Sequence, residues 1–475
     1  MRFFLARGSK ATVQINSLSK KNLTQLSEED DDRRKTWIES SGFRAKPGEL
    51  LLVPTPEGRL GEVLLGRSET SGPLYRYAGL PSKLPKGRYG IADELKPPEA
   101  TLAALGWALG CYEFDRYRKP RKEPSALVFP PGADRGTVSS LAEAVYLVRD
   151  LINTPASDMG PSDLERVVRA VAEPFAAKVH SVVGDGLLSE NWPAVHAVGR
   201  ASADSPRVVD LVWGASTAPK VTLVGKGVCF DTGGLDLKNA GGMLLMKKDM
   251  GGAAHVLGLA YAIMSSKLPV RLRVLIPLVE NSVAGNAMRP LDVIKTRKGL
   301  TVEVGNTDAE GRLILSDALA EADSEKPEVI IDFATLTGAA RVALGTELPA
   351  LFCNQDAVAS ELLDAASAVY DPMWRMPLHA PYRRLLESKV ADTSNVSSGR
   401  YGGAIVAALF LQKFVSKRTP WVHIDMMAWN TEGRAGRPVG GEAMGMRAVF
   451  EWLLKRFPPK SSKRTTTTRR TKSKS

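Results

Sequence analysis

Apolar residues occur in short runs along the second half of the chain, and these runs alternate with segments of helical spacing. Continuous apolar runs predict buried strands, and apolar residues three and four positions apart predict the helices between them. This alternation is typical of an α/β sheet covered by helices on both faces. The predicted strands are Val208–Trp213, Lys220–Val228, Arg271–Val279, Val329–Ala334 and Trp421–Met427. The predicted helices are Val138–Ile152, Ser162–Ala177, Gly252–Ser265, Ile314–Ala322 and Gly403–Val415.

The N-terminal part shows a different pattern, with shorter apolar runs separated by charged and proline-containing segments. A chain of 475 residues is long for a single core, so two domains are expected. We predict a small α/β domain over residues 28–135 and a larger domain, with a mixed sheet between helices, over residues 136–458. The apolar runs of the small domain are Glu49–Val53, Gly61–Gly66 and Ser125–Phe129, its helical spacing covers Ala100–Tyr112, and the linker candidates are Lys119–Pro124 and Pro130–Gly136.

The net charge of +12 comes from the two ends of the chain. Residues 1–27 carry five basic residues and no acid, and residues 460–475 carry seven basic residues and no acid, so the body between them is formally neutral. Residues 1–27 have the composition of a mitochondrial transit peptide, and the alternative is an ordinary first strand and loop. The tail from residue 459 is predicted to be disordered, and it either solvates the protein or binds nucleic acid.

The remaining composition is that of an ordinary globular protein, with 44% apolar and 24% charged residues. No apolar run reaches the roughly 18 residues of a membrane span. Three widely separated cysteines, Cys111, Cys229 and Cys353, form neither a disulfide framework nor a zinc knot, so we expect a reducing compartment.

The most informative polar segment is the octapeptide Asn306–Leu313. It places Asp308, Glu310 and Arg312 two residues apart, and in an extended backbone residues at this spacing project to the same side. The two carboxylates could hold a divalent cation, and the guanidinium could hold an anion. Taken alone, the octapeptide fits a solvated turn with an incidental ion pair equally well.

A second polar segment, between residues 225 and 252, combines glycines with charged residues at the end of a predicted strand. Its key charged residues are Lys226, Asp231, Lys238 and Asp249. Charged groups at the end of a buried strand cost free energy unless something compensates them, and bound cations would do so. The four acids of the two segments would repel one another without cations. Oxygen donors of this kind are not selective among manganese, magnesium, cobalt and zinc.

Together, the two segments resemble the catalytic core of the leucyl aminopeptidase family, metallopeptidase family M17. The octapeptide matches the family signature residue by residue, and the upstream run matches the family's other metal-binding segment. A looser resemblance extends from Arg149 to Ala448, roughly the C-terminal two thirds of the chain, and the residues before about 135 carry no specific motif. Further matching pieces are Ala334–Ala339, Gly399–Ala404 and Trp421–Asn430.

The resemblance implies two metal ions and a role for each charged residue. The implied metal ligands are Lys226, Asp231, Asp249, Asp308 and Glu310. Asp231 and Glu310 would bridge the two metals, and Lys226 could bind only as a neutral amine. Lys238 and Arg312 would be catalytic: Lys238 would stabilise the oxyanion, and Arg312 would hold a bicarbonate that shuttles a proton. The residues implied to line the first side-chain pocket or bind the peptide main chain are Met246, Asn306, Thr335, Leu336, Gly338 and Ala339, for which plain packing is the alternative.

The leading hypothesis is therefore a two-metal aminopeptidase that removes leucine or other apolar N-terminal residues from short peptides. Manganese or zinc would be the metals, and magnesium or cobalt would also fit. The resemblance also implies a homohexamer. We expect a cytoplasmic location, with the mitochondrial matrix as the alternative, and no association with membranes. The second hypothesis is a nucleic-acid-binding protein on the same scaffold that acts through its basic tail.

Overall fold

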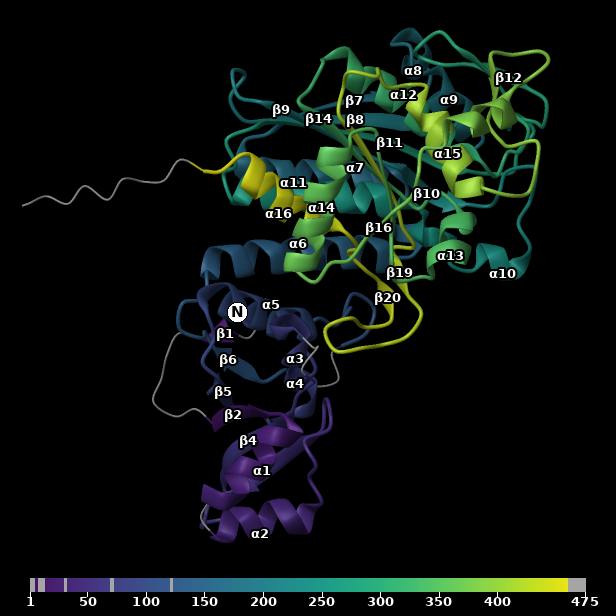
Figure 1. Cartoon of the computed structure of the whole chain (residues 1–475). Helices are drawn as coiled ribbons and strands as arrows, with labels where there is room; N and C mark the ends of the chain where they lie inside the picture. Colours follow the sequence, from purple (N-terminus) through teal and green to yellow (C-terminus); the bar gives the residue numbers. More distant parts are fainter. Residues whose placement is uncertain (1–4, 7–12, 30–31, 69–71, 120–122, 460–475) are drawn as a thin grey trace, which may run out of the picture.

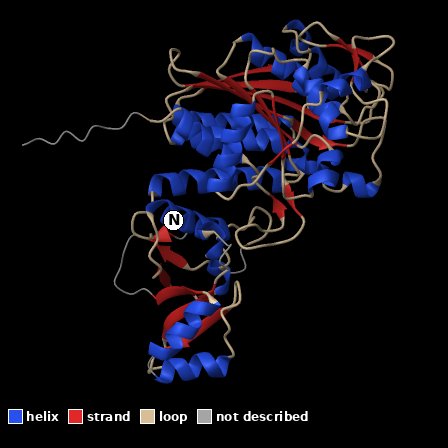
Figure 2. Ribbon diagram, in the orientation of Figure 1, coloured by secondary structure: helices blue, strands red, loops and turns tan. Residues whose placement is uncertain are grey.

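The computed structural model describes residues 5–6, 13–29, 32–68, 72–119 and 123–459. Figures 1 and 2 show a smaller N-terminal domain and a larger C-terminal domain, each built from helices and strands, which confirms the predicted α/β class. The basic tail, residues 460–475, and most of the residues before 13 lie outside the described ranges. Within those ranges, no helix is long and apolar enough to cross a lipid bilayer.

The N-terminal domain is built on a mostly parallel sheet. Among the described residues, its strand order is β1-β6-β5-β2-β4-β3, and the edge strand β3 is antiparallel to its neighbour. Its strands are β1 (Leu5–Ala6), β2 (Val13–Leu18), β3 (Leu50–Pro54), β4 (Leu60–Gly66), β5 (Arg88–Ile91) and β6 (Ala126–Val128). Its helices are α1 (Lys20–Glu29), α2 (Asp32–Ser41), α3 (Pro73–Arg76), α4 (Leu80–Lys83) and α5 (Pro97–Gly110).

The structure begins this domain earlier than residue 28, the predicted boundary. Strand β2 lies inside the sheet between β4 and β5, and Ile15 on β2 is fully buried in the core. Cleavage of a leader near residue 27 would remove this strand and leave the facing backbone groups of β4 and β5 unpaired. Residues from Val13 onward therefore belong to the folded domain, as the alternative interpretation of this segment expected.

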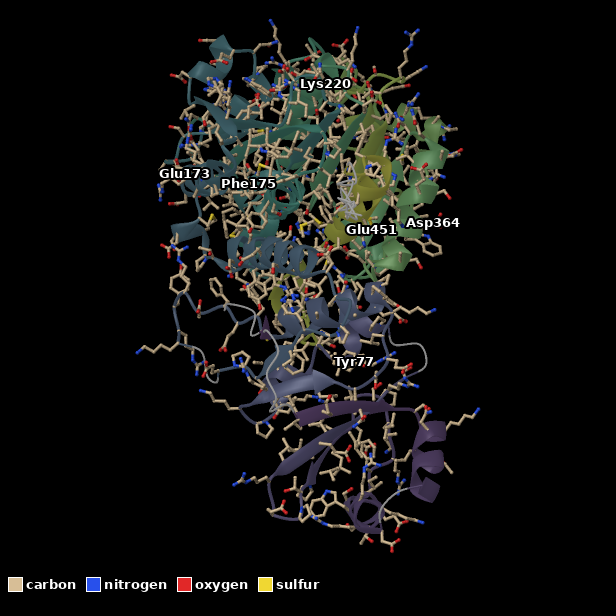
Figure 3. All side chains as sticks on the ribbon, turned by 90° about the vertical axis from the view of Figure 1, so that its left-hand side faces the viewer. Tyr77, Glu173, Phe175, Lys220, Asp364 and Glu451 are labelled. Carbon is tan, nitrogen blue, oxygen red and sulfur yellow. The ribbon has the colours of Figure 1, made fainter. Side chains whose placement is uncertain are left out.

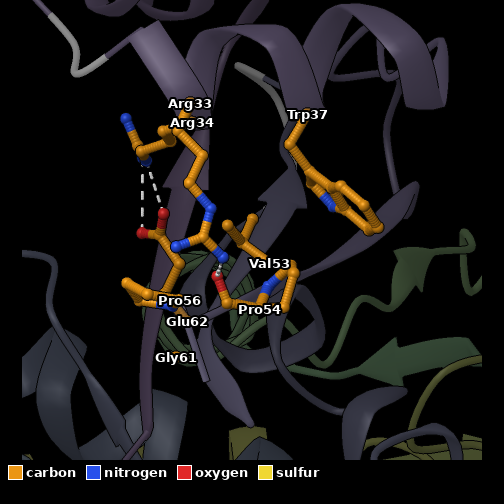
Figure 4. Close-up of a pocket in the computed structure, with 8 residues that line it drawn as sticks. All are labelled: Arg33, Arg34, Trp37, Val53, Pro54, Pro56, Gly61 and Glu62. Atoms are coloured by element: carbon orange, nitrogen blue, oxygen red, sulfur yellow. Dashed lines mark hydrogen bonds and ion pairs between the residues drawn. The ribbon is translucent and has the colours of Figure 1, made fainter. Parts of the chain in front are cut away.

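A pocket of about 260 Å³ opens on the N-terminal domain beside α2 (Figure 4). In this pocket Arg34 forms an ion pair with Glu62, and Arg33 donates a hydrogen bond to the carbonyl of Thr55. The Trp37 indole donates to the carbonyl of Leu52. The polar groups of the pocket are thus engaged with one another, and none of the residues predicted to act in catalysis lines it.

The C-terminal domain is built on a mixed sheet, as predicted. In the part of the chain that the structure describes, the strand order is β16-β15-β18-β14-β9-β11-β8-β7, and β10 pairs with the far end of β11. The central strands β18, β14, β9 and β11 are parallel to one another. The strands are β7 (Lys178–Val183), β8 (Arg207–Trp213), β9 (Lys220–Gly225), β10 (Gly227–Asp231), β11 (Arg271–Asn281), β14 (Val329–Ala334), β15 (Ala350–Cys353), β16 (Trp374–Arg375) and β18 (Trp421–Asp425). Short strands outside this sheet are β12 (Val293–Lys295), β13 (Thr301–Glu303), β17 (Thr393–Ser394), β19 (Trp429–Asn430) and β20 (Gly440–Gly441).

Helices cover both faces of this sheet (Figures 1 and 2). One face is covered by α6 (Arg135–Asn153), α7 (Pro161–Ala172), α11 (Gly251–Ser265), α14 (Asp356–Ala368) and α16 (Met446–Arg456). The other face is covered by α9 (Pro193–Gly199), α12 (Glu310–Ser324) and α15 (Gly403–Gln412). The short helices α8 (Gly186–Ser189), α10 (Ala240–Met243) and α13 (Gly338–Leu344) and the 3-10 helix η3 (Met246–Met250) lie in the connections.

Strand β14, which is apolar except for Asp332, shows why largely apolar runs mark the central strands. Val329, Ile331 and Phe333 face the core on one side of the sheet, and Ile330 and Ala334 face the core on the other side. Successive side chains of a strand point to opposite faces, so both faces must be apolar when helices cover both. The bounds of β14 match the prediction, residues 329–334.

The two domains share one apolar core at the place where α5 packs against α6. Trp107 on α5 and Val145 on α6 belong to the same buried cluster as Val256 on α11. Arg149 on α6 is buried beside Glu442, and its guanidinium donates to the carbonyl of Leu109 in α5. Figure 3 shows the side chains around this junction, with Tyr77 on the N-terminal side and Glu451 and Asp364 on helices of the C-terminal domain. The N-terminal domain therefore packs against the C-terminal domain through a shared apolar core.

Candidate metal centre

Lys226 lies in a short break between β9 and β10, where one strand over residues 220–228 was predicted. Its backbone N–H donates to the carbonyl of Phe333 in β14, and its own carbonyl accepts from the N–H of Ala253 in α11. Gly311 leaves room for the side chain, because a Cβ at that position would lie 2.4 Å from Lys226 Cε. The break thus brings the Lys226 amine to the carboxyl end of the central strands, the usual place for ligands in open α/β sheets.

Three of the predicted acids converge at this end of the sheet. Asp231 ends β10, and Asp308 and Glu310 lie just before and at the start of α12. One carboxylate oxygen from each of them lies within 4.8 Å of the other two. The helix α12 begins at Glu310, four residues before the predicted start at Ile314, and an acid in the first turn is favourable for the helix dipole.

The octapeptide does not adopt the extended backbone that its two-residue spacing was expected to require. A loop that contains Asp308 leads directly into α12, and Glu310 and Arg312 lie in the first turn of that helix. Convergence of the two carboxylates comes from this loop-to-helix transition. The Arg312 guanidinium donates a hydrogen bond to the carbonyl of Asn395, at 2.6 Å.

The Lys226 amine lies between two carboxylates. Its Nζ is 2.7 Å from Asp249 Oδ2 and 2.9 Å from Glu310 Oε1. Burial alone would lower the pKa of Lys226, but Asp249, Glu310 and Asp231 outweigh it and raise the pKa above its ordinary value. Burial and Asp231 raise the pKa of Glu310 to about 8. The Lys226 amine is therefore a positive partner of both Asp249 and Glu310.

Lys238 occupies the equivalent place on the other side of the cluster. Its Nζ is 2.9 Å from Asp231 Oδ2 and also pairs with Asp308. Its side chain is more exposed than that of Lys226, with 15% against 3% of its surface accessible. The Lys238 amine can therefore reach a bound molecule as well as the acids, and Lys226 cannot do so without leaving the cluster.

The donor set fits two hard divalent cations. Four carboxylates face two amines, so the acids outnumber the lysines that pair with them, and the raised pKa of Glu310 reflects this excess. Among the described residues, the buried Oε2 atom of Glu310 has no hydrogen-bond partner. Carboxylate oxygens are ligands for manganese, magnesium and zinc alike, and divalent cations would stabilise the ionised form of Glu310.

Residues that were not predicted hold the two polar segments together. The Thr307 hydroxyl donates to the carbonyl of Gly233 at 2.6 Å and accepts from the N–H of Asp236 at 2.9 Å. The side-chain amide of Asn281, the last residue of β11, donates to Asp231 Oδ1 at 2.9 Å and to the carbonyl of Thr307 at 3.1 Å. These bonds fix Asp231 against the loop that carries the other acids.

Asn395 fixes the signature loop from its other side. Its side-chain oxygen accepts from the N–H groups of Gly305 and Asn306 at 2.8 and 3.3 Å. Its side-chain nitrogen donates to the carbonyls of Asn306 and Ala309 at 2.8 and 3.3 Å. Asn395 is fully buried, and its own carbonyl accepts the bond from Arg312. No local feature of the sequence around Asn395 indicated this role.

The segment after β14 is tied both to the metal cluster and to β18. The Thr335 hydroxyl donates to Asp249 Oδ1 at 2.7 Å. Asp425, the last residue of β18, accepts from the N–H of Leu336 at 2.9 Å and from the N–H and hydroxyl of Thr337. The predicted pocket residues Thr335 and Leu336 are thus held next to the acids, and Asp425 is a further residue that the sequence did not indicate.

The remaining predicted pocket residues have different surroundings. Gly338 begins α13 and is exposed, and a Cβ added to it would meet no atom within 4 Å. Ala339 and Met246 are half-buried, and Met246 begins the 3-10 helix that carries Asp249. The side-chain oxygen of Asn306 accepts from the N–H of Asp308 at 2.7 Å, so it shapes the loop. Open space therefore lies in front of Gly338, beside the segments that carry the acids.

Comparisons with known proteins agree with this geometry. Residues 146–450 match the model of the cytosol aminopeptidase family catalytic domain, and residues 13–130 match that of the M17 aminopeptidase N-terminal domain. A probable cytosol aminopeptidase of Leifsonia xyli subsp. xyli is 40% identical over 435 residues, which cover 86% of this chain and 87% of that protein. The crystal structure of cytosol aminopeptidase from Coxiella burnetii superposes with a TM-score of 0.93 at 50% identity, covering 95% of this chain and 99% of that one. The bottromycin maturation enzyme BotP in complex with Mn superposes with a TM-score of 0.83 at 35% identity, covering 94% and 99%.

Proposed function

Because the chain belongs to the cytosol aminopeptidase family, M17, we propose that it is a two-metal aminopeptidase that hydrolyses the N-terminal peptide bond of short peptides. The observation that carries this proposal is the convergence of four carboxylates and two amines at the carboxyl end of the central strands. The buried, unpartnered oxygen of Glu310 supports a cation as the missing partner. Membership of this family establishes the aminopeptidase class, and the roles given to single residues below are our proposals.

The proposed ligands divide between two metal positions, and Asp231 and Glu310 belong to both. The ligands of one position would be Lys226, Asp231, Asp249 and Glu310, and those of the other Asp231, Asp308 and Glu310. Two divalent ions bound here would supply Lewis-acid chemistry, by polarising the scissile carbonyl and lowering the pKa of water. Manganese is supported by the Mn complex of the related BotP, zinc is the second choice, and magnesium or cobalt would also fit the oxygen donors.

Lys238 is proposed to stabilise the oxyanion that develops on the scissile carbonyl. Its ammonium group is held by Asp231 and Asp308, and part of the side chain remains accessible. Asp231 and Asp308 also raise its pKa above the ordinary value against the effect of burial, so the amine is protonated at neutral pH. A protonated donor that is already oriented can stabilise developing negative charge without reorganisation.

Arg312 is proposed to hold a bicarbonate that acts as a proton shuttle. One guanidinium nitrogen donates to the carbonyl of Asn395, and within the described part of the chain its buried Nε has no hydrogen-bond partner. Burial lowers the pKa of Arg312 to about 10, so the group remains cationic at neutral pH. A small anion would give the unpartnered Nε an acceptor.

The first residue of the substrate is proposed to lie between η3 and the start of α13. Met246, Leu336 and Ala339 provide apolar contacts there, which supports a preference for leucine or another apolar N-terminal residue. Thr335, Gly338 and Asn306 would face the peptide main chain or the pocket wall. The free α-amine of the substrate would bind a metal, and an acetylated amine could not. The enzyme would therefore cleave only at the N-terminus of a peptide.

The oligomeric state and the cellular location are proposed from membership of the family. We propose a homohexamer, and a cytoplasmic location with the mitochondrial matrix as the alternative. The folded strand β2 restricts a cleavable leader to residues before Val13. Sedimentation of the purified protein tests the hexamer.

The nucleic-acid hypothesis depends on the seven basic residues among residues 460–475. These residues lie outside the described ranges, and the body of the protein is formally neutral. Binding through the tail would therefore be an added function beside peptide hydrolysis.

The proposed function is tested with leucine p-nitroanilide and its N-acetylated form in the presence of Mn²⁺ or Zn²⁺. We expect hydrolysis of the free amine only, because the acetylated nitrogen cannot bind a metal. Hydrolysis of both substrates at similar rates would contradict the exopeptidase proposal.

A further inference from the structure

Asn153, the last residue of α6, lies where three parts of the molecule meet. It belongs to the stretch from Arg149 in which the resemblance to the family begins, and the proposed mechanism does not use it. Its side-chain oxygen accepts from the N–H of Gly441 in β20 at 2.8 Å, and its side-chain nitrogen donates to the Tyr112 hydroxyl at 3.0 Å. Its main-chain carbonyl accepts from Lys247 Nζ at 2.6 Å. This buried residue therefore connects the N-terminal domain, β20 and η3.

Tyr112 is the contribution of the N-terminal domain to this junction. It lies two residues after α5 and within residues 13–130, the part that matches the N-terminal domain of the family. Its hydroxyl donates to Asp150 Oδ1 at 2.8 Å and so presents its oxygen to the Asn153 amide. Its ring packs edge-on against that of Tyr146 in α6, with 4.9 Å between the ring centroids. Contacts on two sides thus fix the hydroxyl relative to α6.

Lys247 meets the same junction from η3, and its ammonium group is held by a carbonyl and an aromatic ring. The Nζ atom bonds the Asn153 carbonyl and lies 5.5 Å from the centroid of the Trp429 ring in β19. The nearby acids pair with Lys226 and Lys238, and none of the described acids forms an ion pair with Lys247. The carbonyl belongs to the C-terminal end of α6, where the helix dipole favours a cation.

The helix η3 depends on support of this kind. It is a 3-10 helix of five residues that carries the proposed ligand Asp249 and the proposed pocket residue Met246. Hydrogen bonds within 3-10 helices have poor geometry, so tertiary contacts decide where such a helix lies. On the metal side, Asp249 is held by Lys226 at 2.7 Å and by the Thr335 hydroxyl at 2.7 Å. Lys247 holds the same short helix from the opposite side, against α6.

We propose that Lys247 is a positioning residue for the metal ligand Asp249, and that the N-terminal domain contributes to this positioning through the hydrogen bond between Asn153 and Tyr112. This inference rests on the proposed two-metal function. Removing a residue that holds a metal ligand in place typically weakens metal binding by roughly 10- to 100-fold. Lys247 acts on Asp249 through the backbone of η3, so we expect the low end of this range, about tenfold.

Titration of the folded, metal-free protein with Mn²⁺ in a calorimeter tests the proposal without relying on activity. The wild type should show two binding steps, and Asp249→Ala should abolish one of them, which identifies the step that depends on Asp249. Lys247→Met removes the donor, and it should weaken that step about tenfold and leave unchanged the step that Asp308 serves. Lys247→Arg can still donate to the Asn153 carbonyl and lie over Trp429, so it should stay within about threefold of the wild type.

Two further variants make the test specific. Lys298→Met is the matched control, because Lys298 Nζ also donates to a main-chain carbonyl at 2.6 Å, that of Lys413, away from η3. It should leave both binding steps as in the wild type. Tyr112→Phe removes only the hydroxyl in the N-terminal domain that the Asn153 amide bonds. It should weaken the Asp249 step about threefold, the share of one neutral hydrogen bond.

The outcomes separate this inference from the proposed function. An Asp249 step of unchanged affinity in Lys247→Met would overturn the inference alone, as would equal weakening of both steps or the same weakening in Lys298→Met. Tighter binding in Lys247→Met would show that its charge acts by repulsion, and would overturn it too. Unchanged affinity in Tyr112→Phe would overturn the contribution of the N-terminal domain, and this variant alone decides if Lys247→Met does not fold. A folded wild type that binds no Mn²⁺ would overturn the proposed function itself.

Discussion

Replacing Asn395 by leucine tests whether the metal-binding loop is held by the hydrogen bonds seen around this residue. Leucine has a similar volume but offers neither a donor nor an acceptor. The substitution removes all four side-chain bonds to the Gly305–Ala309 segment and leaves the Asn395 carbonyl, which accepts from Arg312, in place. The change therefore acts on the loop and spares the direct partner of Arg312.

The expected cost follows from the geometry. Two of the four bonds are 2.8 Å long and two are 3.3 Å, so two are well formed. Each good bond contributes about 1 kcal/mol, and a buried carbonyl left without a donor costs about 1–3 kcal/mol more. We expect a loss of about 3 kcal/mol in the free energy of unfolding, equivalent to roughly a hundredfold in the unfolding equilibrium.

Guanidinium unfolding measures this loss, and calorimetric titration with Mn²⁺ measures its effect on metal binding. Metal affinity should fall as well, because the loosened loop carries Asp308. Asn354→Leu is the matched control: Asn354 also bridges two backbone segments, with bonds of 2.8 and 2.9 Å, but at the amino end of β18. It should lose stability and keep metal affinity. An Asn395→Leu protein with unchanged stability and metal affinity would refute the role assigned to this residue.

The other predictions concern single groups and segments. Asp308→Ala should abolish binding of the metal that Asp308 holds, seen as a lost equivalent in a Mn²⁺ titration, whereas Lys238→Ala should keep the metals and lower kcat by about 10²–10³-fold. Buried His255 is held by two backbone hydrogen bonds, and burial lowers its pKa to about 4. In the unfolded chain, His255 takes up a proton near its ordinary pKa of about 6.5. The free energy of unfolding should therefore fall as the pH drops from about 6.5 to 4, by up to roughly 3 kcal/mol. Denaturation curves of His255→Gln at several pH values should lack this part of the pH dependence. Deleting residues 460–475 should leave peptide hydrolysis intact; salt-sensitive DNA binding that disappears with the tail would establish the added function, and its absence in the full chain would remove it.

Much of the C-terminal fold could be predicted from the sequence because its central strands are buried on both faces. The run Val329–Ala334 is apolar except for Asp332, and the observed strand has the same bounds. The break at Lys226 was not predicted, because the glycines on both sides of this lysine were interpreted as room for a ligand and the strand was extended through them to residue 228. A strand before residue 28, observed as β2, was only the alternative interpretation, since the basic residues around it suggested a separate segment.

The charged residues of the site were predictable, and most of the residues that hold them in place were not. Asp231 and Glu310 stand in distinctive local motifs. Asn395, Asn281 and Asp425 act through hydrogen bonds to segments that are distant in sequence, and the patterns of their neighbours assign them no such partner. Such contacts depend on the tertiary structure, so spacing along the chain does not reveal them.

The central claim is that two bound metals at the acid cluster are needed for aminopeptidase activity. The most direct test removes metal with a chelator, returns Mn²⁺ in known amounts, and follows leucine p-nitroanilide hydrolysis together with bound metal. The account predicts no activity without metal and activity that rises until two ions are bound per chain. A folded protein that holds two ions per chain and cleaves no aminoacyl substrate would contradict it.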